Sequence, residues 1–311
     1  MADFDPYALQ RILPALDKNS VDPELAKTWR RFYQIDFTQH NPDLDCRLGV
    51  IEVSGYRIAL QVCRPVQAVA TLLVLHGYYD HMGLYGHVYQ WALAQGFAVL
   101  ACDLPGHGLS SGARASINSF AEYQQVLQAM FAKAQELGLP KPWHMLGQST
   151  GAAIALDYLL TQQPLCQLGE TILLAPLVRP RAWQQAKLLY HLVKPFRSSV
   201  PRRYSDNSHD PQFIEFVRQD PLQARILPTA WVGALAQWIE HIEQAKPSAR
   251  SPIIIQGEGD RTVDWQHNLT VLEDKFHTPN ILRLPDARHH LANENLALRE
   301  QIFSFLSTQL T

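Results

Sequence analysis

The chain has 311 residues, which is enough for one large α/β domain with an insertion or for two domains. Hydrophobic residues make up 47% of the chain and charged residues 18%, proportions that are ordinary for a globular protein. The formal net charge of −2 argues against nucleic acid as an obligate partner.

The first 45 residues are expected to form a helical, partly polar extension. Apolar residues recur there at helical spacing in two stretches: Leu9, Ile12, Leu13 and Leu16, then Leu25, Trp29 and Phe32. The polar segment 36–45 contains Pro42 and is predicted to be a linker.

A core of alternating strands and helices is predicted for residues 46–179 and 251–311. It begins with a hairpin, because two alternating runs, 48–53 and 56–62, flank Ser54-Gly55. Apolar runs predict the further strands 70–75, 98–102, 143–146, 171–174, 253–256 and 281–284. Helices are expected at 85–95, at 119–137 with a capping box of Ser119 and Glu122, at 152–160 and at 297–306. This order indicates a mostly parallel sheet with helices on both faces and an antiparallel hairpin at one edge.

Residues 180–250 interrupt the alternation and are too long for a simple crossover. The stretch is rich in aromatic residues, and Trp231, Leu235, Trp238 and Ile242 share one helix face. It carries ten Lys and Arg residues against six Asp and Glu residues. We expect an inserted helical cap over the carboxyl edge of the sheet. Its basic residues, including Arg197, Arg202 and Arg203, are predicted to make peripheral contact with anionic membranes. A solvated basic face with no role is the alternative that stays open.

The four cysteines, Cys46, Cys63, Cys102 and Cys166, are scattered without a C-x-x-C spacing. Their spacing predicts reduced, buried thiols rather than a disulfide or zinc framework. The N-terminus lacks a basic-then-apolar signal pattern, and no run of 18 apolar residues occurs. A cytoplasmic protein is therefore expected.

A possible catalytic motif lies between a predicted strand and a predicted helix. It is the G-x-S-x-G sequence Gly147-Gln148-Ser149-Thr150-Gly151. This context is typical of a nucleophile elbow, a strained turn that exposes its central serine. A plain glycine-rich turn between a strand and a helix could have the same five residues. Whether the motif is a nucleophile elbow therefore depends on whether the chain also supplies a catalytic base and a carboxylate.

A nucleophilic serine needs a base and a carboxylate that orients the base, here expected in the chain order Ser, Asp, His. Asp260 follows the strand 253–256, and His289 follows the strand 281–284. The order and the strand-end positions together predict a triad of Ser149, His289 and Asp260. His290 remains an alternative base. The oxyanion hole is predicted to use the N–H groups of Thr150 and Tyr78, the latter in the loop after strand 70–75.

With these residues the chain resembles α/β-hydrolases of the monoacylglycerol lipase and lysophospholipase group, which overlaps the serine aminopeptidase-like hydrolases. The resemblance covers about residues 45–308. Four blocks carry it: His76-Gly77 with Asp80-His81, the loop 103–110, the GQSTG elbow, and the tail loops 257–263 and 287–294. It implies a helical cap and cleavage of carboxylic esters, often of acylglycerols or lysophospholipids.

The chain departs from the family pattern at Tyr78-Tyr79, where a small residue and a glycine are usual. The two rings are expected to narrow the acyl pocket, which disfavours a long-chain lipid substrate. His76, His81 and His107 are expected to brace turns, and Asp103 is not at the elbow position of a nucleophile. No cofactor and no metal site are predicted.

The leading hypothesis is a serine ester hydrolase that needs no cofactor and acts on a small-molecule or lipid ester. Two alternatives stay open. The same triad would also serve an acyltransferase or an amide or peptide hydrolase, and a non-catalytic ligand-binding scaffold would have the same fold. The acyl length, the alcohol and the oligomeric state are not predicted.

Overall fold

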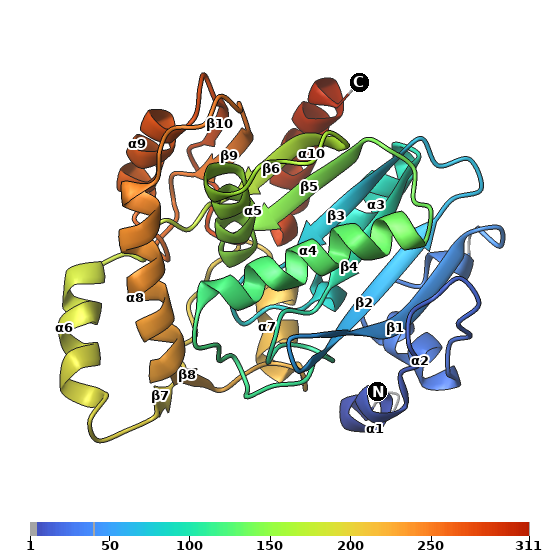
Figure 1. Ribbon diagram of the computed structural model, residues 1–311, viewed down its shortest axis with the longest axis horizontal. Coiled ribbons are helices and arrows are strands. Elements are labelled where there is room, and N and C mark those ends of the chain that lie inside the picture. Colours follow the sequence, from blue (N-terminus) through green and yellow to red (C-terminus); the bar gives the residue numbers. More distant parts are fainter. Residues whose placement is uncertain (1–4, 40, 311) are drawn as a thin grey trace.

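An eight-stranded sheet runs through the centre of the molecule, and the computed structural model describes residues 5–39 and 41–310 (Figure 1). Its strands lie in the order β1-β2-β4-β3-β5-β6-β9-β10. The strands are β1 (Asp45–Val53), β2 (Tyr56–Arg64), β3 (Ala70–Leu75), β4 (Phe97–Cys102), β5 (Trp143–Gln148), β6 (Leu168–Leu174), β9 (Ile253–Gly257) and β10 (Asn280–Leu284). The pairs β1/β2 and β2/β4 are antiparallel and the others parallel, which confirms the predicted α/β-hydrolase sheet with a hairpin at one edge.

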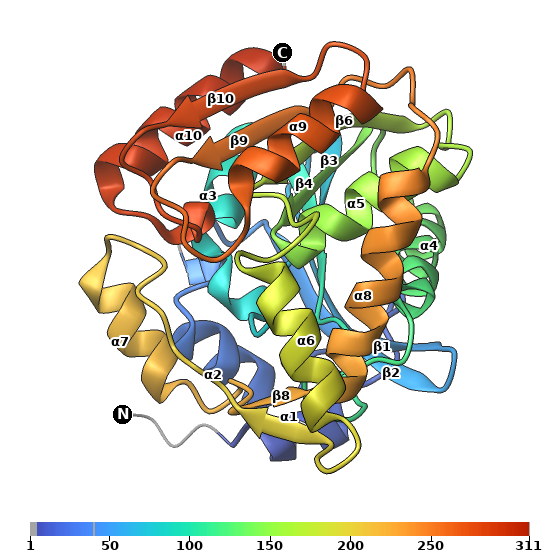
Figure 2. The same cartoon turned by 90° about the vertical axis from the view of Figure 1, so that its left-hand side faces the viewer.

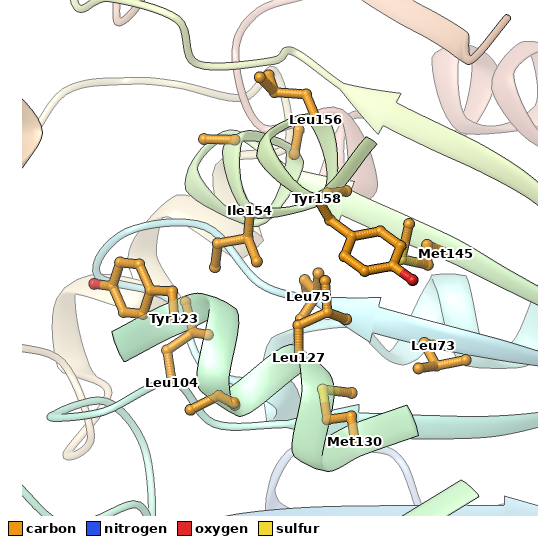
Figure 3. Close-up of a cluster of buried hydrophobic side chains, with 14 of the residues drawn as sticks. Leu73, Leu75, Leu104, Tyr123, Leu127, Met130, Met145, Ile154, Leu156 and Tyr158 are labelled. Atoms are coloured by element: carbon orange, nitrogen blue, oxygen red, sulfur yellow. The ribbon is translucent and has the colours of Figure 1, made fainter. Parts of the chain in front are cut away.

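Helices cover both faces of this sheet. One face is packed by α4 (Phe120–Glu136), α5 (Thr150–Thr161), α8 (Thr229–Gln244) and α9 (Trp265–Lys275), and the other by α1 (Pro6–Ile12), α2 (Glu24–Phe32), α3 (Gly86–Ala94) and α10 (Leu296–Gln309). In β3, Leu73 and Leu75 face the first core, which Figure 3 shows, whereas Leu72 and Val74 face the second. A strand buried on both sides has no polar face, so it forms a continuous apolar run.

The capping box predicted at the start of α4 is present. Ser119 Oγ accepts a hydrogen bond from the Ala121 N–H at 3.2 Å, and the Ser119 N–H donates to Glu122 Oε1 at 3.0 Å. The prediction for the N-terminal helices needs correction, since the helical spacing was expected to continue to Leu16. The first helix instead ends at Ile12, because Pro14 disfavours a helical conformation at the residue before it. Ile12 is 50% exposed. The helix α9 was not expected at all.

The prediction of four reduced, buried thiols is wrong. Cys46 and Cys63 form a disulfide, because they lie opposite each other on β1 and β2 with their Cα atoms 4.2 Å apart. Of the other two, Cys102 is buried and Cys166 is exposed.

Residues 180–250 form three helices and a two-stranded sheet, with α6 (Trp183–Val193), β7 (Ser199–Pro201), α7 (Pro211–Gln219), β8 (Ile226–Pro228) and α8 in chain order. They lie on the side toward which the parallel strands point (Figures 1 and 2). The apolar face predicted for α8 is buried against the core, with Trp231, Leu235, Trp238 and Ile242 each at most 6% exposed. Two short 3-10 helices, Met82–Leu84 and Leu291–Asn293, follow β3 and β10, and a third spans Phe37–Gln39.

Candidate active site

Ser149 lies in the tight turn between β5 and α5. Its backbone has φ 54° and ψ −108°, a combination that costs about 1–3 kcal/mol and persists only where the surroundings enforce it. A Cβ atom on Gly147 would lie 2.3 Å from the carbonyl carbon of Gly151, and one on Gly151 would lie 2.0 Å from the carbonyl oxygen of Leu75. The strained elbow is therefore as predicted, and its glycines are required by close backbone contacts.

The Ser149 side chain is not exposed as expected, since the residue is only 7% exposed. The loop after β3 explains this difference. A Cβ atom on Gly77 of this loop would lie 3.5 Å from Ser149 Cβ, so the loop lies directly against the elbow.

Asp260 and His289 form a buried ion pair, with His289 Nδ1 2.7 Å from Asp260 Oδ2. Asp260 Oδ1 accepts hydrogen bonds from the N–H groups of Thr262 at 2.7 Å and Val263 at 3.1 Å. Burial alone would raise the pKa of Asp260, but the charge of His289 and these hydrogen bonds outweigh it and lower that pKa. Burial would likewise lower the pKa of His289, but Asp260 outweighs it and raises that pKa above 6.5.

The loops that carry these groups meet at one edge of the sheet. Asp260 follows β9 and His289 follows β10, as predicted, and a Cβ atom on Gly257 would lie 2.3 Å from the Ala287 carbonyl oxygen. Gln148, the residue before the elbow serine, donates from Nε2 to the His289 carbonyl oxygen at 2.9 Å. The histidine loop is therefore tied to the elbow itself.

Two backbone N–H groups are free next to Ser149. The Gly77 N–H is not one of them, because it donates a hydrogen bond to Tyr85 Oη at 3.0 Å. Within residues 5–39 and 41–310, by contrast, the N–H groups of Tyr78 and Thr150 have no acceptor. The two predicted oxyanion donors, one directly after Ser149 and one directly after Gly77, therefore have no competing acceptor among the residues that the structure describes.

His290 has a different environment from His289. Its ring Nε2 lies 3.1 Å from Asp80 Oδ2, and its backbone N–H donates to the Asn207 carbonyl oxygen at 2.7 Å. Asp80 also accepts a hydrogen bond from Tyr85 Oη at 3.0 Å. The structure therefore places His289, and not His290, beside Asp260.

Two of the other loop histidines brace turns. His76 Nδ1 lies 2.7 Å from the Gly77 carbonyl oxygen, and its Nε2 accepts a hydrogen bond from the Leu104 N–H at 2.9 Å. His107 Nδ1 lies 2.9 Å from the Pro105 carbonyl oxygen. Burial lowers the pKa of His76 to about 3 and that of His107 to about 4, so both rings are neutral near pH 7.

The third, His81, braces a turn as well, since its Nδ1 accepts a hydrogen bond from the Gly83 N–H at 3.2 Å. It also forms a further buried His–Asp pair that sequence reasoning missed. His81 Nε2 lies 2.7 Å from Asp220 Oδ2, and Tyr33 Oη donates to Asp220 Oδ1 at 2.7 Å. These residues come from the segment after α2, the loop after β3 and the end of α7. Their separation along the chain leaves no local signal that predicts the cluster.

Two residues of segment 180–250 contact the tyrosines of the loop after β3, and sequence reasoning missed these contacts too. Trp231 stacks on Tyr78 with ring centroids 3.6 Å apart and planes inclined by 16°. The Arg202 guanidinium lies 4.0 Å from the ring centroid of Tyr79. Arg202 is therefore partly buried, with its guanidinium against the Tyr79 ring.

No metal-binding group of three or more His, Cys, Asp or Glu side chains occurs among the described residues. No helix in the described part of the chain is long and apolar enough to cross a membrane.

The family described as serine aminopeptidase, S33, matches residues 66–295. Human monoglyceride lipase is 27% identical over 237 residues, which cover 73% of this chain and 77% of that protein. The phospholipase YtpA of Bacillus subtilis is 26% identical over 200 residues, 62% of this chain and 76% of that protein.

Solved structures agree on the fold. A soluble variant of monoglyceride lipase from Saccharomyces cerevisiae, in complex with a substrate analogue, has a TM-score of 0.72. It is 16% identical, and the superposition covers 85% of this chain and 94% of that one. Identity this low supports the shared α/β-hydrolase fold and nothing finer.

Proposed function

The chain belongs to the serine aminopeptidase S33 family, and we propose that it cleaves carboxylic esters through an acyl-enzyme on Ser149. One observation carries the proposal. The strained elbow that holds Ser149 is joined through Gln148 to the loop of His289, whose ring is paired with the buried Asp260.

Each group then has one role in the mechanism. Ser149 Oγ attacks the ester carbonyl while His289 accepts its proton at Nε2, because Nδ1 is committed to Asp260. Asp260 orients the imidazole and stabilises its cation. The N–H groups of Tyr78 and Thr150 hold the oxyanion. His289 then protonates the leaving alcohol, and water hydrolyses the acyl-enzyme with His289 as the base.

The proposed substrates are monoacylglycerols or lysophospholipids, and two relatives are named a monoglyceride lipase and a phospholipase. The Tyr78 and Tyr79 rings, with centroids 4.1 Å apart and with Trp231 stacked on Tyr78, belong to the loop that lies against the elbow. We therefore expect a preference for short or medium acyl chains over long ones.

We also propose that residues 180–250 act as a cap that touches membranes through α6 rather than through Arg202. Large apolar side chains are exposed on α6 and just after it: Leu188 64%, Leu189 59%, Leu192 62% and Phe196 85%. Exposed Lys194 and Arg197 lie beside them, and apolar side chains flanked by basic ones favour an anionic membrane surface.

Labelling with a fluorophosphonate, combined with hydrolysis of p-nitrophenyl esters of increasing chain length, tests the chemistry. Ser149→Ala should abolish both labelling and turnover, at a cost on the order of 10⁴-fold or more. A wild-type protein that is not labelled would be a non-catalytic scaffold. Product analysis with added alcohols separates hydrolysis from acyl transfer, and a peptide substrate tests amide cleavage.

Sedimentation with vesicles that contain phosphatidylglycerol tests the membrane contact. The double variant Leu188→Ser with Leu192→Ser should bind less, whereas Val66→Ser should not, although Val66 is 76% exposed in the loop between β2 and β3. Equal vesicle binding by wild type and double variant would exclude α6 as the contact surface.

A further inference from the structure

The loop after β3 has an unusual backbone conformation at the residue next to the proposed oxyanion donor. Tyr79 has φ 72°, in the left-handed region that side chains other than glycine rarely adopt. Such a conformation persists only when contacts around it enforce it. The peptide between Gly77 and Tyr78 is held at its carbonyl oxygen, which accepts a hydrogen bond from the Asp80 N–H at 3.1 Å and lies 2.7 Å from His76 Nδ1. On the tyrosine side, further restraint comes from contacts of the Tyr78 and Tyr79 side chains.

Trp231 of α8 supplies the first of these contacts. Its ring lies nearly parallel to the Tyr78 ring, at 16° and 3.6 Å between centroids. The indole is itself fixed, because it is only 6% exposed and its Nε1 donates to Tyr123 Oη of α4 at 3.2 Å. Tyr78 Oη in turn donates to the Ala115 carbonyl oxygen at 2.8 Å. The Tyr78 side chain is thus held at its tip by the core and across its face by α8.

Arg202 supplies the second contact. Its guanidinium lies 4.0 Å from the Tyr79 ring centroid and 4.5 Å from that of Tyr204. Its Nη1 donates to Gln223 Oε1 at 2.5 Å and to the Ala224 carbonyl oxygen at 3.3 Å. No carboxylate of the described chain lies within ion-pair distance of it. The charge therefore acts on the tyrosine ring face, where a partly desolvated cation is attracted by the ring quadrupole.

From these contacts we propose that Trp231 and Arg202 are positioning residues for the oxyanion hole, holding Tyr78 and Tyr79 so that the Tyr78 N–H points at the reacting carbonyl. This rests on the proposed function of Ser149 and adds two residues from segment 180–250 to it. Neither residue touches the reacting atoms. Each acts through a tyrosine ring, so its loss should lower kcat rather than weaken ground-state binding.

Steady-state kinetics on a short p-nitrophenyl ester test the proposal. Loss of a whole oxyanion donor lowers kcat by about 10²–10³-fold, so a misdirected donor should cost about 10–100-fold. We expect Trp231→Leu and Arg202→Met each to lower kcat by that factor with KM changed less than about threefold. Trp231→Phe and Arg202→Lys keep a ring or a cation over the tyrosine and should recover most of kcat.

Trp238→Leu is the matched control on the same helix. Trp238 is also buried, stacks on Phe120 of α4 at 4.7 Å and donates from Nε1 to Asp157 Oδ2 at 3.0 Å, but it does not contact the loop after β3. Trp238→Leu and Trp231→Leu should lose similar thermal stability, while only Trp231→Leu loses kcat.

A second readout measures the oxyanion hole directly. A trifluoromethyl ketone forms a tetrahedral adduct whose oxygen needs the two N–H donors, whereas a fatty acid product does not. Arg202→Met, which should fold even if Trp231→Leu does not, is expected to bind the ketone at least tenfold more weakly and the product equally well. Unchanged kcat and ketone affinity in Arg202→Met, or equal loss of kcat in Trp238→Leu, would overturn the positioning role. Activity in Ser149→Ala would instead overturn the proposed function.

Discussion

The buried pair of His81 and Asp220 provides a test of what holds segment 180–250 to the rest of the chain. Both side chains are 0% exposed, and Asp220 also accepts hydrogen bonds from Tyr33 Oη and the Leu222 N–H. Asp220→Asn keeps the volume and removes the charge. Removal of one partner from a buried ion pair costs about 3–5 kcal/mol, and the retained amide favours the lower end. For a chain of this size, about 3 kcal/mol lowers Tm by about 6 °C.

The pH dependence of this loss follows from the shifted pKa values. Burial would lower the pKa of His81, but Asp220, with Asp103 and Asp80 behind it, raises it above 6.5. The stability that His81 contributes is therefore complete below pH 6.5 and is lost as the pH rises through the raised value. Burial would raise the pKa of Asp220, but His81 outweighs it and lowers that pKa below 3.8, so its contribution is present above pH 3.8. The loss of stability in Asp220→Asn should therefore be largest between pH 3.8 and pH 6.5.

Thermal denaturation followed by circular dichroism between pH 5 and pH 9 measures this loss. Asp206→Asn is the matched control, because Asp206 pairs with Arg218 at 3.0 Å with side chains 63% and 49% exposed. An exposed pair contributes at most about 1 kcal/mol. If Asp220→Asn lowers Tm no more than Asp206→Asn does, or if its effect does not shrink as the pH rises, the buried pair does not stabilise the fold as argued.

Three further outcomes are expected. Asp260→Asn should lower kcat by several orders of magnitude and move the acid limb of the kcat/KM profile to lower pH, because His289 loses the carboxylate that raises its pKa. His289→Ala should abolish ester hydrolysis while His290→Ala retains measurable kcat, and the opposite ranking would reassign the base. Gly151→Ala should lower the free energy of unfolding by about 3 kcal/mol in a denaturant titration, since its Cβ would lie 2.0 Å from the Leu75 carbonyl oxygen.

The sequence predicted those parts of the fold whose signal is local. All eight strands of the main sheet were expected, because their apolar runs are short and bounded by turn residues. The helix α9 was missed because Asn268 and Lys275 lie on its buried side, where an apolar periodicity would normally show. The Lys275 ammonium group donates a hydrogen bond to the Ala245 carbonyl oxygen at 2.7 Å, which lowers the cost of burying it.

The disulfide had a usable signal in the hairpin. The turn Ser54-Gly55 pairs Val53 with Tyr56, and counting outward seven residues along each strand reaches Cys46 and Cys63. The spacing of the cysteines along the chain carries no such information, which is why spacing alone led to the wrong prediction. Register in a hairpin follows from the turn, so the turn was the better guide.

The candidate site likewise has parts with a local sequence signal and parts without one. Ser149, Asp260 and His289 could be predicted because each follows a recognisable strand, and the structure brings the loops of all three together. The contacts of Arg202 and Trp231 could not be found in this way. A cation over a ring or a stack of two rings joins residues that are far apart in sequence and has no periodicity to reveal it.

These contacts also bear on how a substrate would enter. Tyr78, Tyr79 and His81 each contact a different residue of segment 180–250: Trp231, Arg202 and Asp220. A rigid opening of the whole segment would break all three contacts and disturb the oxyanion donor. The helix α6 makes none of them, and of its residues only Trp183 is buried. Since local opening occurs where few apolar contacts oppose it, we expect entry to involve α6 while α8 stays in place. Amide hydrogen exchange should then be much faster in α6 than in α8, and equal protection of the two helices would contradict this route.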